Sequence, residues 1–467
     1  MTSGTTQPQT FCRPQALNAK NPAFRVEWEE NDPENPRNWS SWYKGYMIGT
    51  ISLSTTVMVL YATSYTSGLP GIEATFNGIS HTDGLVGLTT YMLGMALGTL
   101  VLTPFSEFYG RYSTHLISTA LFTVLIIPVA TASSLSAVVT SRFFGGFAGS
   151  ATVATAPGSV NDLVSGKNRA LAFSCWSLAA MNAAVIGPIM GGFVFQFLGW
   201  RWVTWIVVIC ESVLCVALFF SRETYAPVLL QNKRKRIQRE TGEMRWWCQY
   251  DPDEEMDCLF WDVYIGVLYA ILFLCFVGYP IVFHELRGWS PGLAGLGYCG
   301  IGTGIALAVL AEPLIRTLID RHPPDPATGR PSPEANISVI CIGAVLIPIG
   351  QLWFSWTALP PVHWASPILA GLLFGFGNAL VFIYVVNYIA GSYGIYAASA
   401  MAGMSVIRYF FAGVLPLAGE KIYRALGVKW AATTLALVEI FLIPIPFIFY
   451  RYGGRIRRRS MLISRLN

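Results

Sequence analysis

Long apolar stretches alternate with short polar ones along most of the chain, and their lengths suit membrane-spanning helices. An α-helix needs about 20 residues to cross the apolar core of a bilayer. Twelve such segments are expected, at residues 45–69, 84–105, 113–133, 136–161, 170–198, 202–220, 259–283, 291–314, 336–357, 363–390, 395–418 and 430–450. The pattern predicts an all-α polytopic membrane protein with twelve transmembrane helices, for which the lipid bilayer is the first partner.

The composition supports this class and excludes others. Of the 467 residues, 53% are hydrophobic and only 12% are charged, whereas about a quarter of an ordinary soluble domain is charged. The net charge of +5 gives no indication of nucleic-acid binding, so no nucleic-acid partner is expected. The five histidines lie at loops or span edges without H-x-x-H or H-E-x-x-H spacing. Neither a metal site nor a cofactor is therefore expected, and a membrane-embedded enzyme is a weak alternative.

The location of the positive charges predicts the orientation. An even number of spans places both termini on one side of the membrane. If that side is cytosolic, cytosolic segments hold 24 of the 31 lysines and arginines and the opposite side holds five. This excess follows the positive-inside rule, so both termini are expected in the cytosol.

The polar segments divide the chain into two halves of six spans each. The longest internal polar segment, 221–258, runs from KRKR to DPDEE and is interpreted as a solvated connector. The predicted organisation is a disordered cytosolic tail at 1–43, six-helix halves at 44–220 and 259–451 around that loop, and a basic cytosolic tail at 452–467. Gly94 and Gly98 in span 2 have counterparts in Gly300 and Gly304 in span 8, which suggests a duplicated half.

The fifth span carries a ridge of small residues. Ala179, Ala183, Gly187 and Gly191 recur every four residues, so they line one helical face that a neighbouring backbone can approach closely. Pro188 removes one backbone hydrogen bond within the same span, which permits a kink. From these features alone the span reads as a packing helix.

The segment from Gly187 to Gly192 also matches a family motif. Gly187, Pro188, Gly191 and Gly192 form the pattern Gly-Pro-x-x-Gly-Gly, which resembles the antiporter motif of major facilitator drug:proton antiporters. Further resemblance to the fungal twelve-span branch lies in NPRNW, GWRW, ETYAPVLL, YPIVF, GWSP and AASAMAGMSVIR. The resemblance implies a major facilitator fold of two six-helix halves with a substrate cavity between them.

The turn after span 2 resembles the cytoplasmic gating motif of that family. Glu107 occupies the acidic position, and Gly110 and Arg111 are intact. Thr103 replaces the opening glycine and Tyr112 replaces the following basic residue, so the gate is expected to be weaker than in relatives. The alternative is a plain surface ion pair of less than about 1 kcal/mol.

Arg142 in span 4 resembles the family arginine that is followed by small residues. Burying arginine at a helix centre costs about 2.5–3.5 kcal/mol on insertion scales, so it is expected to face a cavity or a partner. We assign it to proton coupling, with snorkelling to the surface as the alternative. Four carboxyls within or near spans are candidate proton sites, and the sequence does not choose among them: Asp262, Glu211, Glu312 and Glu439.

The resemblance implies a proton-coupled exporter of amphipathic drugs, toxins or secondary metabolites that works by alternating access. Candidate pocket residues are Tyr65, Trp176, Asn182, Asn378, Tyr384 and Asn387. The small-molecule substrate and protons are the remaining partners, and we expect a monomer in the plasma membrane, with the vacuolar membrane as the alternative. A symporter or uniporter for a small polar solute and a polyamine exporter stay open. An ATP-driven pump is excluded, because the chain has no G-x-x-x-x-G-K-[ST] loop.

Overall fold

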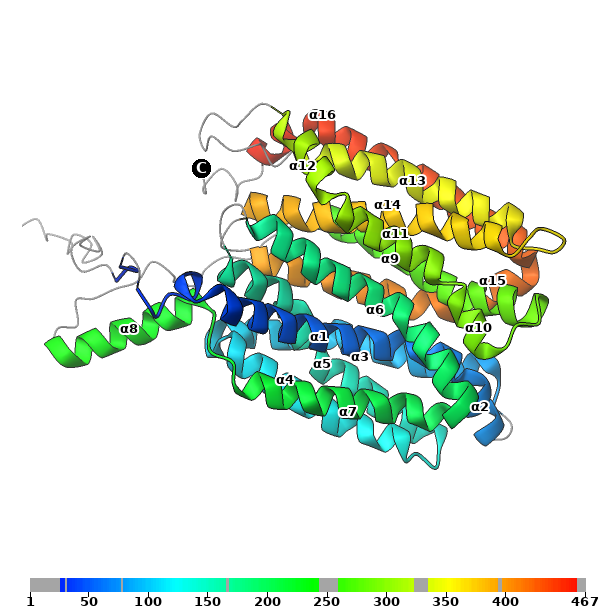
Figure 1. Cartoon of the computed structure of the whole chain (residues 1–467), viewed down its shortest axis with the longest axis horizontal. Helices are drawn as coiled ribbons and strands as arrows, with labels where there is room; N and C mark the ends of the chain where they lie inside the picture. The colour runs from blue at the N-terminus through cyan, green and yellow to red at the C-terminus, as the bar shows by residue number, and fades with distance from the viewer. Residues whose placement is uncertain are drawn as a thin grey trace, which may run out of the picture.

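The computed structural model is a bundle of long, roughly parallel helices (Figure 1). It describes residues 26–29, 32–76, 79–164, 168–242, 259–322, 335–393 and 397–459. The first half contains α1 (Ser41–Ser67), α2 (Leu69–Thr75), α3 (His81–Tyr109), α4 (Arg111–Ala130), α5 (Leu135–Leu163), α6 (Asn168–Leu198) and α7 (Trp200–Phe219), and α8 (Ala226–Thr241) follows it.

The second half repeats the bundle with more interruptions. It contains α9 (Leu259–Pro280) continued by η3 (Ile281–Leu286), α10 (Pro291–Leu296), α11 (Cys299–Leu310), α12 (Glu312–Asp320), α13 (Ala335–Thr357), α14 (Ala365–Tyr393), α15 (Ala397–Leu442) and α16 (Pro444–Arg459). In Figure 1 the start of α1, the end of α16 and all of α8 lie at the left end of the bundle. We call this end the tail side and the opposite end the far side.

The helices account for twelve crossings. Ten described segments are long and apolar enough to span a bilayer. One of the ten, Met401–Tyr452, has 52 residues, and it reverses direction at Gly427, where the backbone leaves helical geometry (φ 70°, ψ 158°). The twelfth crossing is α5, which is rich in Gly, Ala, Ser and Thr and is buried along most of its length. Its small residues lower its hydropathy, and they also let it lie against α3.

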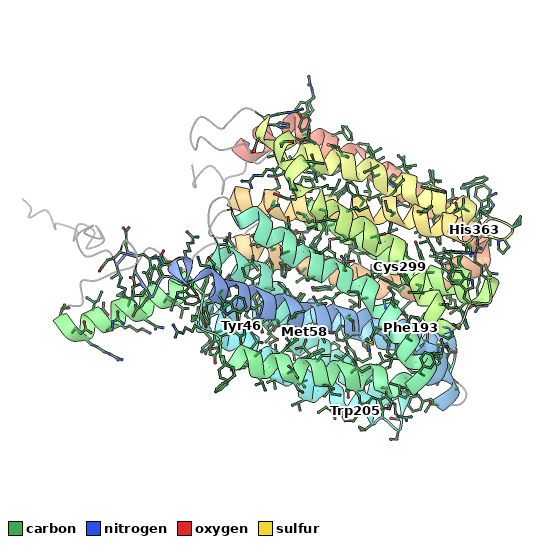
Figure 2. The ribbon with its side chains drawn as sticks, viewed as in Figure 1. Tyr46, Met58, Phe193, Trp205, Cys299 and His363 are labelled. Atoms are coloured by element: carbon green, nitrogen blue, oxygen red, sulfur yellow. The ribbon has the colours of Figure 1, made fainter. Side chains whose placement is uncertain are left out.

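The outer surface of the bundle suits contact with lipid. Phe441 and Leu310 are 82% and 75% exposed, as expected for side chains that face acyl chains instead of water. In Figure 2, Tyr46, Met58 and Phe193 mark the tail side, the middle depth and the far side of the bundle.

The two halves share packing details, which confirms the repeat expected from the sequence. Gly94 and Gly98 on α3 face backbone carbonyls of α5, and Gly300 and Gly304 on α11 face backbone carbonyls of α14. The carbonyls belong to Phe143, Phe147, Ile368 and Leu372. A Cβ at any of the four glycines would clash with the neighbouring backbone, so the close approach of each helix pair requires glycine.

A second shared feature joins the last two spans of each half. Gly199 (φ 88°) and Gly427 (φ 70°) make the reversals before the final span, in a backbone conformation that favours glycine. A buried glutamate follows each of them by twelve residues, Glu211 on α7 and Glu439 on α15. The same register of turn and carboxyl in both halves is a further sign of duplication.

The segment before α1 is not a free tail over its described residues, contrary to the sequence prediction. Asp32 accepts a hydrogen bond from Lys233 on α8 at 2.7 Å, and Glu34 pairs with Arg236 at 2.7 Å. Val26 packs with Leu230 beside these ion pairs. The Lys233 ammonium lowers the pKa of Asp32, so the pair stays charged at neutral pH. Part of the predicted solvated connector is therefore a helix that holds the N-terminal segment.

Candidate functional site

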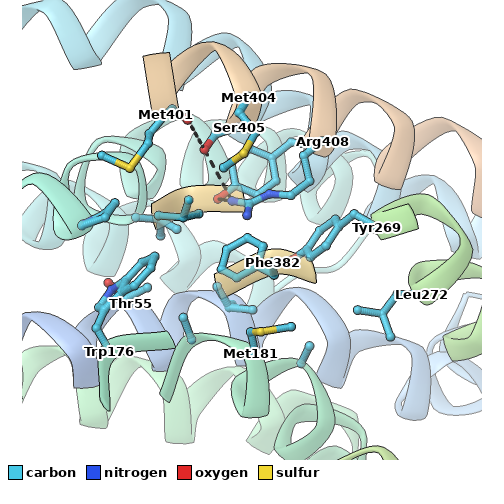
Figure 3. Close-up of a pocket in the computed structure, with 17 residues that line it drawn as sticks. Thr55, Trp176, Met181, Tyr269, Leu272, Phe382, Met401, Met404, Ser405 and Arg408 are labelled. Atoms are coloured by element: carbon cyan, nitrogen blue, oxygen red, sulfur yellow. Dashed lines mark hydrogen bonds between the residues drawn. The ribbon is translucent and has the colours of Figure 1, made fainter. Parts of the chain in front are cut away.

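The main pocket lies between the two halves, from the middle depth of the bundle toward the tail side. It contains about 630 Å³ of empty space, part of which is open to solvent. Helices α1, α5 and α6 line one side, and α9, α14 and α15 line the other (Figure 3). Its lining is mostly aromatic, aliphatic and sulfur-containing, and includes Trp176, Met181, Tyr269, Phe382, Met401, Met404 and Tyr409. This lining suits an apolar organic molecule with few polar groups.

Arg408 of α15 brings a positive charge to this pocket. Its side chain is 7% exposed, and its guanidinium lies 4.8 Å from the Tyr269 ring centroid and 5.2 Å from that of Phe382. One guanidinium nitrogen donates to Tyr409 Oη at 2.9 Å. The residue stands in the family-like AASAMAGMSVIR segment, but the sequence alone gave no reason to place it in a pocket.

Two of the predicted pocket residues line this region. Trp176 lines the main pocket, and its ring lies 6.4 Å from that of Phe382 across the two halves. Asn378 lines a smaller pocket that shares Met181 and Tyr269 with the main one, although its amide nitrogen donates to its own helix, at Phe374 O.

The other four predicted pocket residues lie elsewhere. Tyr65 donates to Gly84 O at 2.8 Å and lines a separate small pocket near the far side. Asn182 lies at the contact between α6 and α11, beside Gly302. Tyr384 and Asn387 are not among the residues that line the three described pockets.

Arg142 is buried inside the first half. Its side chain is 1% exposed, so it does not snorkel to the surface. The guanidinium lies over the rings of Tyr61, Tyr65 and Tyr91 at 4.5, 4.1 and 5.0 Å, and Nε donates to Gly87 O at 2.7 Å. Among the described residues, no carboxylate lies close enough to the Arg142 guanidinium to form an ion pair. Cation–π contacts and one backbone carbonyl therefore hold this charge.

The turn between α3 and α4 holds Arg111 in a network of several helices. Arg111 donates to Ser106 Oγ at 3.0 Å, lies 3.6 Å from Asp162 of α5, and stacks on Tyr225 at 4.6 Å. Its backbone N–H donates to Glu223 Oε1 at 2.8 Å.

Glu223 and Gly110 fix the start of α4. Glu223 also accepts from the backbone N–H of Tyr112, so one carboxylate satisfies two amides at the N-terminus of α4. The same carboxylate accepts from the backbone N–H groups of Thr224 and Tyr225 next to it in the chain. Gly110 has φ 95°, and a Cβ there would overlap this carboxylate. Glu107, predicted as the acidic member of the gate, is half-buried on the same turn. Sequence reasoning missed the roles of Asp162 and Glu223, because both lie far from the motif along the chain.

The small residues of α6 contact both a neighbour in their own half and the other half. A Cβ on Gly187 would overlap Thr63 Oγ1 and lie 2.8 Å from Leu60 O of α1, and Gly191 faces the Ser64 carbonyl. Gly192 faces the Pro291 carbonyl of α10. The predicted close-packed ridge is therefore present, with α1 as its partner.

The kink residue stands at the same contact. The carbonyl of Pro188 accepts a hydrogen bond from Ser67 Oγ at 3.0 Å. It also faces Gly295, which follows Pro291 by one turn. The Gly-Pro segment thus lies where three helices meet near the far side.

Contacts between the halves close the far side. Thr89 Oγ1 of α3 donates to Gly413 O of α15 at 2.8 Å, and the Gly292 N–H of α10 donates to Gln196 of α6 at 3.2 Å. His81 lies 3.9 Å from Glu420 at the same end. The main pocket is therefore shut off from the far side by packed helices.

Three of the four candidate carboxyls are buried. Glu211 is fully buried and accepts from Ser54 Oγ at 3.1 Å. Glu439 is 2% exposed, and neither carboxyl oxygen has a hydrogen-bond partner among the described residues. Asp262, at the start of α9, is 5% exposed and faces Gly403. Glu312 is only half-buried, which makes it the weakest candidate. In the described part of the chain, no group of three or more His, Cys, Asp or Glu could hold a metal ion.

Comparisons with known proteins identify the family of the chain. The sequence profile of the Major Facilitator Superfamily matches residues 51–416. A citrinin biosynthesis cluster MFS transporter of Monascus ruber is 35% identical over 464 residues, which cover 94% of this chain and 92% of that relative. A major facilitator superfamily multidrug transporter of Aspergillus fumigatus is 34% identical over 461 residues, covering 93% and 75% of the two chains. The xylose transporter XylE of E. coli, in a partially occluded inward-open conformation, has a TM-score of 0.61 at 15% identity and covers 88% of this chain and 98% of its own.

Proposed function

Because the chain belongs to the major facilitator superfamily, and is thus a multi-span membrane transporter of small molecules and not an enzyme, we propose that it is a proton-coupled exporter. Its cargo is an amphipathic organic compound such as a drug, toxin or secondary metabolite. Relatives named as a multidrug transporter and as a biosynthesis-cluster transporter support this cargo class.

One observation carries the proposal: the apolar pocket between the halves extends toward the tail side, while the far side is closed. Alternating access requires a central site that is exposed to one compartment at a time. With both termini in the cytosol, as the charge distribution predicts, the pocket lies on the cytosolic side of the closed far end, where it would load a compound from the cytosol. The two six-helix halves at 44–220 and 259–451 are the bodies that would move.

Proton coupling needs a group that gains and loses a proton, which a guanidinium does not do at physiological pH. Arg142 therefore acts on coupling indirectly, by holding the tyrosine cluster between α1, α3 and α5 in this conformation. The proton carrier is a carboxyl, and the buried Glu211 and Glu439 at matching positions of the two halves support that role. The turn with Glu107, Gly110 and Arg111 acts as the cytoplasmic gate. We place the protein in the plasma membrane as a monomer.

Energised cells test the export function. A yeast strain that lacks its own drug exporters is loaded with a lipophilic fluorescent compound, and efflux is followed with and without this protein. Expression should speed efflux severalfold, and a protonophore should remove the difference, because the driving force is the proton gradient. Efflux that is equal in expressing and non-expressing cells contradicts the proposal, provided that the protein is present at the plasma membrane.

A further inference from the structure

The charge of the main pocket narrows the class of substrate, on the basis of the exporter function proposed above. We propose that the pocket selects aromatic compounds that carry an anionic group, such as a carboxylate, and that Arg408 binds this group. The inference rests on the charge, the hydrogen bonding and the ring geometry around that one side chain.

The first observation is the charge balance of the lining. Arg408 is the only ionised side chain among the residues that line the described main pocket. Neutral hydroxyl groups come from four lining residues, Thr55, Tyr269, Ser405 and Tyr409. The nearby carboxyl of Asp262 faces Gly403 and is not part of the lining. A pocket with one cation and no carboxylate disfavours cationic compounds, including polyamines, and favours a single negative charge.

The second observation is that Arg408 has unused donors. A guanidinium offers five N–H donors. One nitrogen of Arg408 donates to Tyr409 Oη at 2.9 Å and makes a long contact of 3.5 Å with Ser405 Oγ, and both partners are neutral. Nε is buried and has no partner among the described residues. A buried charge without a counter-ion is costly, and a ligand carboxylate would supply both the charge and the planar acceptor pair that a guanidinium binds best.

The third observation is the set of rings that surrounds the guanidinium. Tyr269, Phe382 and Tyr409 lie 4.8, 5.2 and 4.8 Å from it, so cation–π contacts hold its position without neutralising it. Figure 3 shows Arg408 reaching from α15 toward Phe382, with Trp176 and Met181 across the pocket on α6. The anionic group would lie at Arg408 and the aromatic body between Trp176 and the methionines, whose flexible side chains adapt to different shapes.

Two further arginines of the described chain are buried, Arg111 and Arg142, and neither lines the main pocket. Arg142 lies over three tyrosine rings and its Nε donates to Gly87 O at 2.7 Å, while one terminal nitrogen is buried without a partner among the described residues. The positive charge that faces the main pocket is therefore that of Arg408.

A matched pair of ligands tests the proposal. Naphthalene-2-carboxylate and naphthalene-2-carboxamide have nearly the same size and differ in charge. Their equilibrium binding to purified full-length protein in nanodiscs is measured by calorimetry at pH 7. The wild-type protein should bind the carboxylate at least about tenfold more tightly than the amide, as charge-assisted hydrogen bonds allow. In Arg408→Gln this ratio should fall toward one, and Arg408→Lys should keep an intermediate ratio, because lysine retains the charge but loses the planar fork.

Trp176→Leu is the control for pocket shape, because this ring lines the pocket but is not one of the three rings over the Arg408 guanidinium. It removes a ring and no charge, so it should weaken both ligands by similar factors and leave their ratio near the wild-type value. An Arg408→Gln protein that elutes as a monodisperse species and keeps the wild-type ratio overturns the proposal. A wild-type protein that binds both compounds equally, or neither, overturns it as well. The assay uses no proton gradient, so a failure of proton-driven transport would count against the exporter function and not against this site.

Discussion

At the scale of single residues, the three described arginines that are buried differ in the groups that stabilise their charge. Arg142 has three tyrosine rings and a backbone carbonyl, whereas Arg111 has a carboxylate, a serine hydroxyl and a ring. Arg408 has rings and a phenol but no anion among the described residues. The first two charges are held by contacts within the protein, whereas Arg408 lines the pocket without such an anion, as the proposed substrate site requires.

Substitutions of Arg142 test its indirect role in coupling. Arg142→Ala should abolish gradient-driven export while leaving substrate binding within a fewfold of wild type, because the residue does not line the main pocket. Arg142→Lys should retain partial export, since it keeps a charge over the tyrosine rings but loses the planar fork. Binding and proton-driven transport are measured separately in both variants. If Arg142→Ala still concentrates substrate against a gradient, the arginine has only a structural role.

At the scale of helices, part of the packing could be read from sequence spacing and part could not. The four-residue repeat of small side chains predicted the close-packed face of α6, because helical periodicity alone sets which residues share a face. It did not predict that α1 is the partner. The lengths of the apolar segments predicted a reversal between the last two spans, which the structure places at Gly427. They also predicted the crossing by α5, although this helix is made of small residues with modest hydropathy.

The pocket was the least predictable part, for a physical reason. Its lining depends on how far each helix is rotated toward the other half, and that rotation is set by contacts between residues far apart in sequence. Trp176 and Asn378 were predicted and lie in this region, whereas Tyr384 and Asn387 are on the same helix as Asn378 but outside the described pockets. Arg408 was missed because the cost of burying an arginine within a span predicts a cavity or a partner but does not say which of the two the side chain meets.

The α6 face carries a prediction about helix approach. Gly187→Leu should insert and fold but lose at least about tenfold in export rate, because its side chain would overlap Thr63 and the backbone of α1. Gly187→Ala should lose less. Gly49→Ala on α1 is the matched control, since a Cβ there meets nothing within 4 Å, and its export should equal wild type. Normal efflux from a well-expressed Gly187→Leu protein would contradict the close-packing role.

The turn between α3 and α4 carries a prediction about gating. The contacts of Arg111 are made in a conformation whose far side is closed. If the conformation that is open at the far side lacks these contacts, they stabilise the closed conformation relative to it. Arg111→Ala and Glu107→Gln should therefore raise the labelling rate of a cysteine introduced at Thr89, which is now buried at the far side.

Arg222→Ala serves as the control for this experiment. Arg222 is an exposed cation next to Glu223 in sequence that stacks on Tyr43 at 5.8 Å, so its removal should leave labelling unchanged. If Arg111→Ala and Glu107→Gln also leave labelling unchanged, the network around the buried Arg111 is only structural and the gate lies elsewhere.

At the scale of the whole molecule, the duplicated halves provide two matching sets of parts around one pocket. Each half has a glycine-mediated helix pair and a glycine reversal followed by a buried glutamate. The pocket is lined from both halves, so a movement of one half against the other changes which compartment it meets. Export driven by protons then requires that proton binding and substrate binding favour different states of this movement.

The direction of coupling tests this account most directly. Purified protein is reconstituted in proteoliposomes with an acidic lumen and a neutral exterior, and the entry of naphthalene-2-carboxylate is compared with that into protein-free liposomes. Antiport predicts accumulation in the acidic lumen that a protonophore abolishes, opposite to the passive distribution of a weak acid, which favours the alkaline side. Absence of protein-dependent accumulation for this compound and its amide, or accumulation only when the lumen is made alkaline, would contradict proton-coupled export.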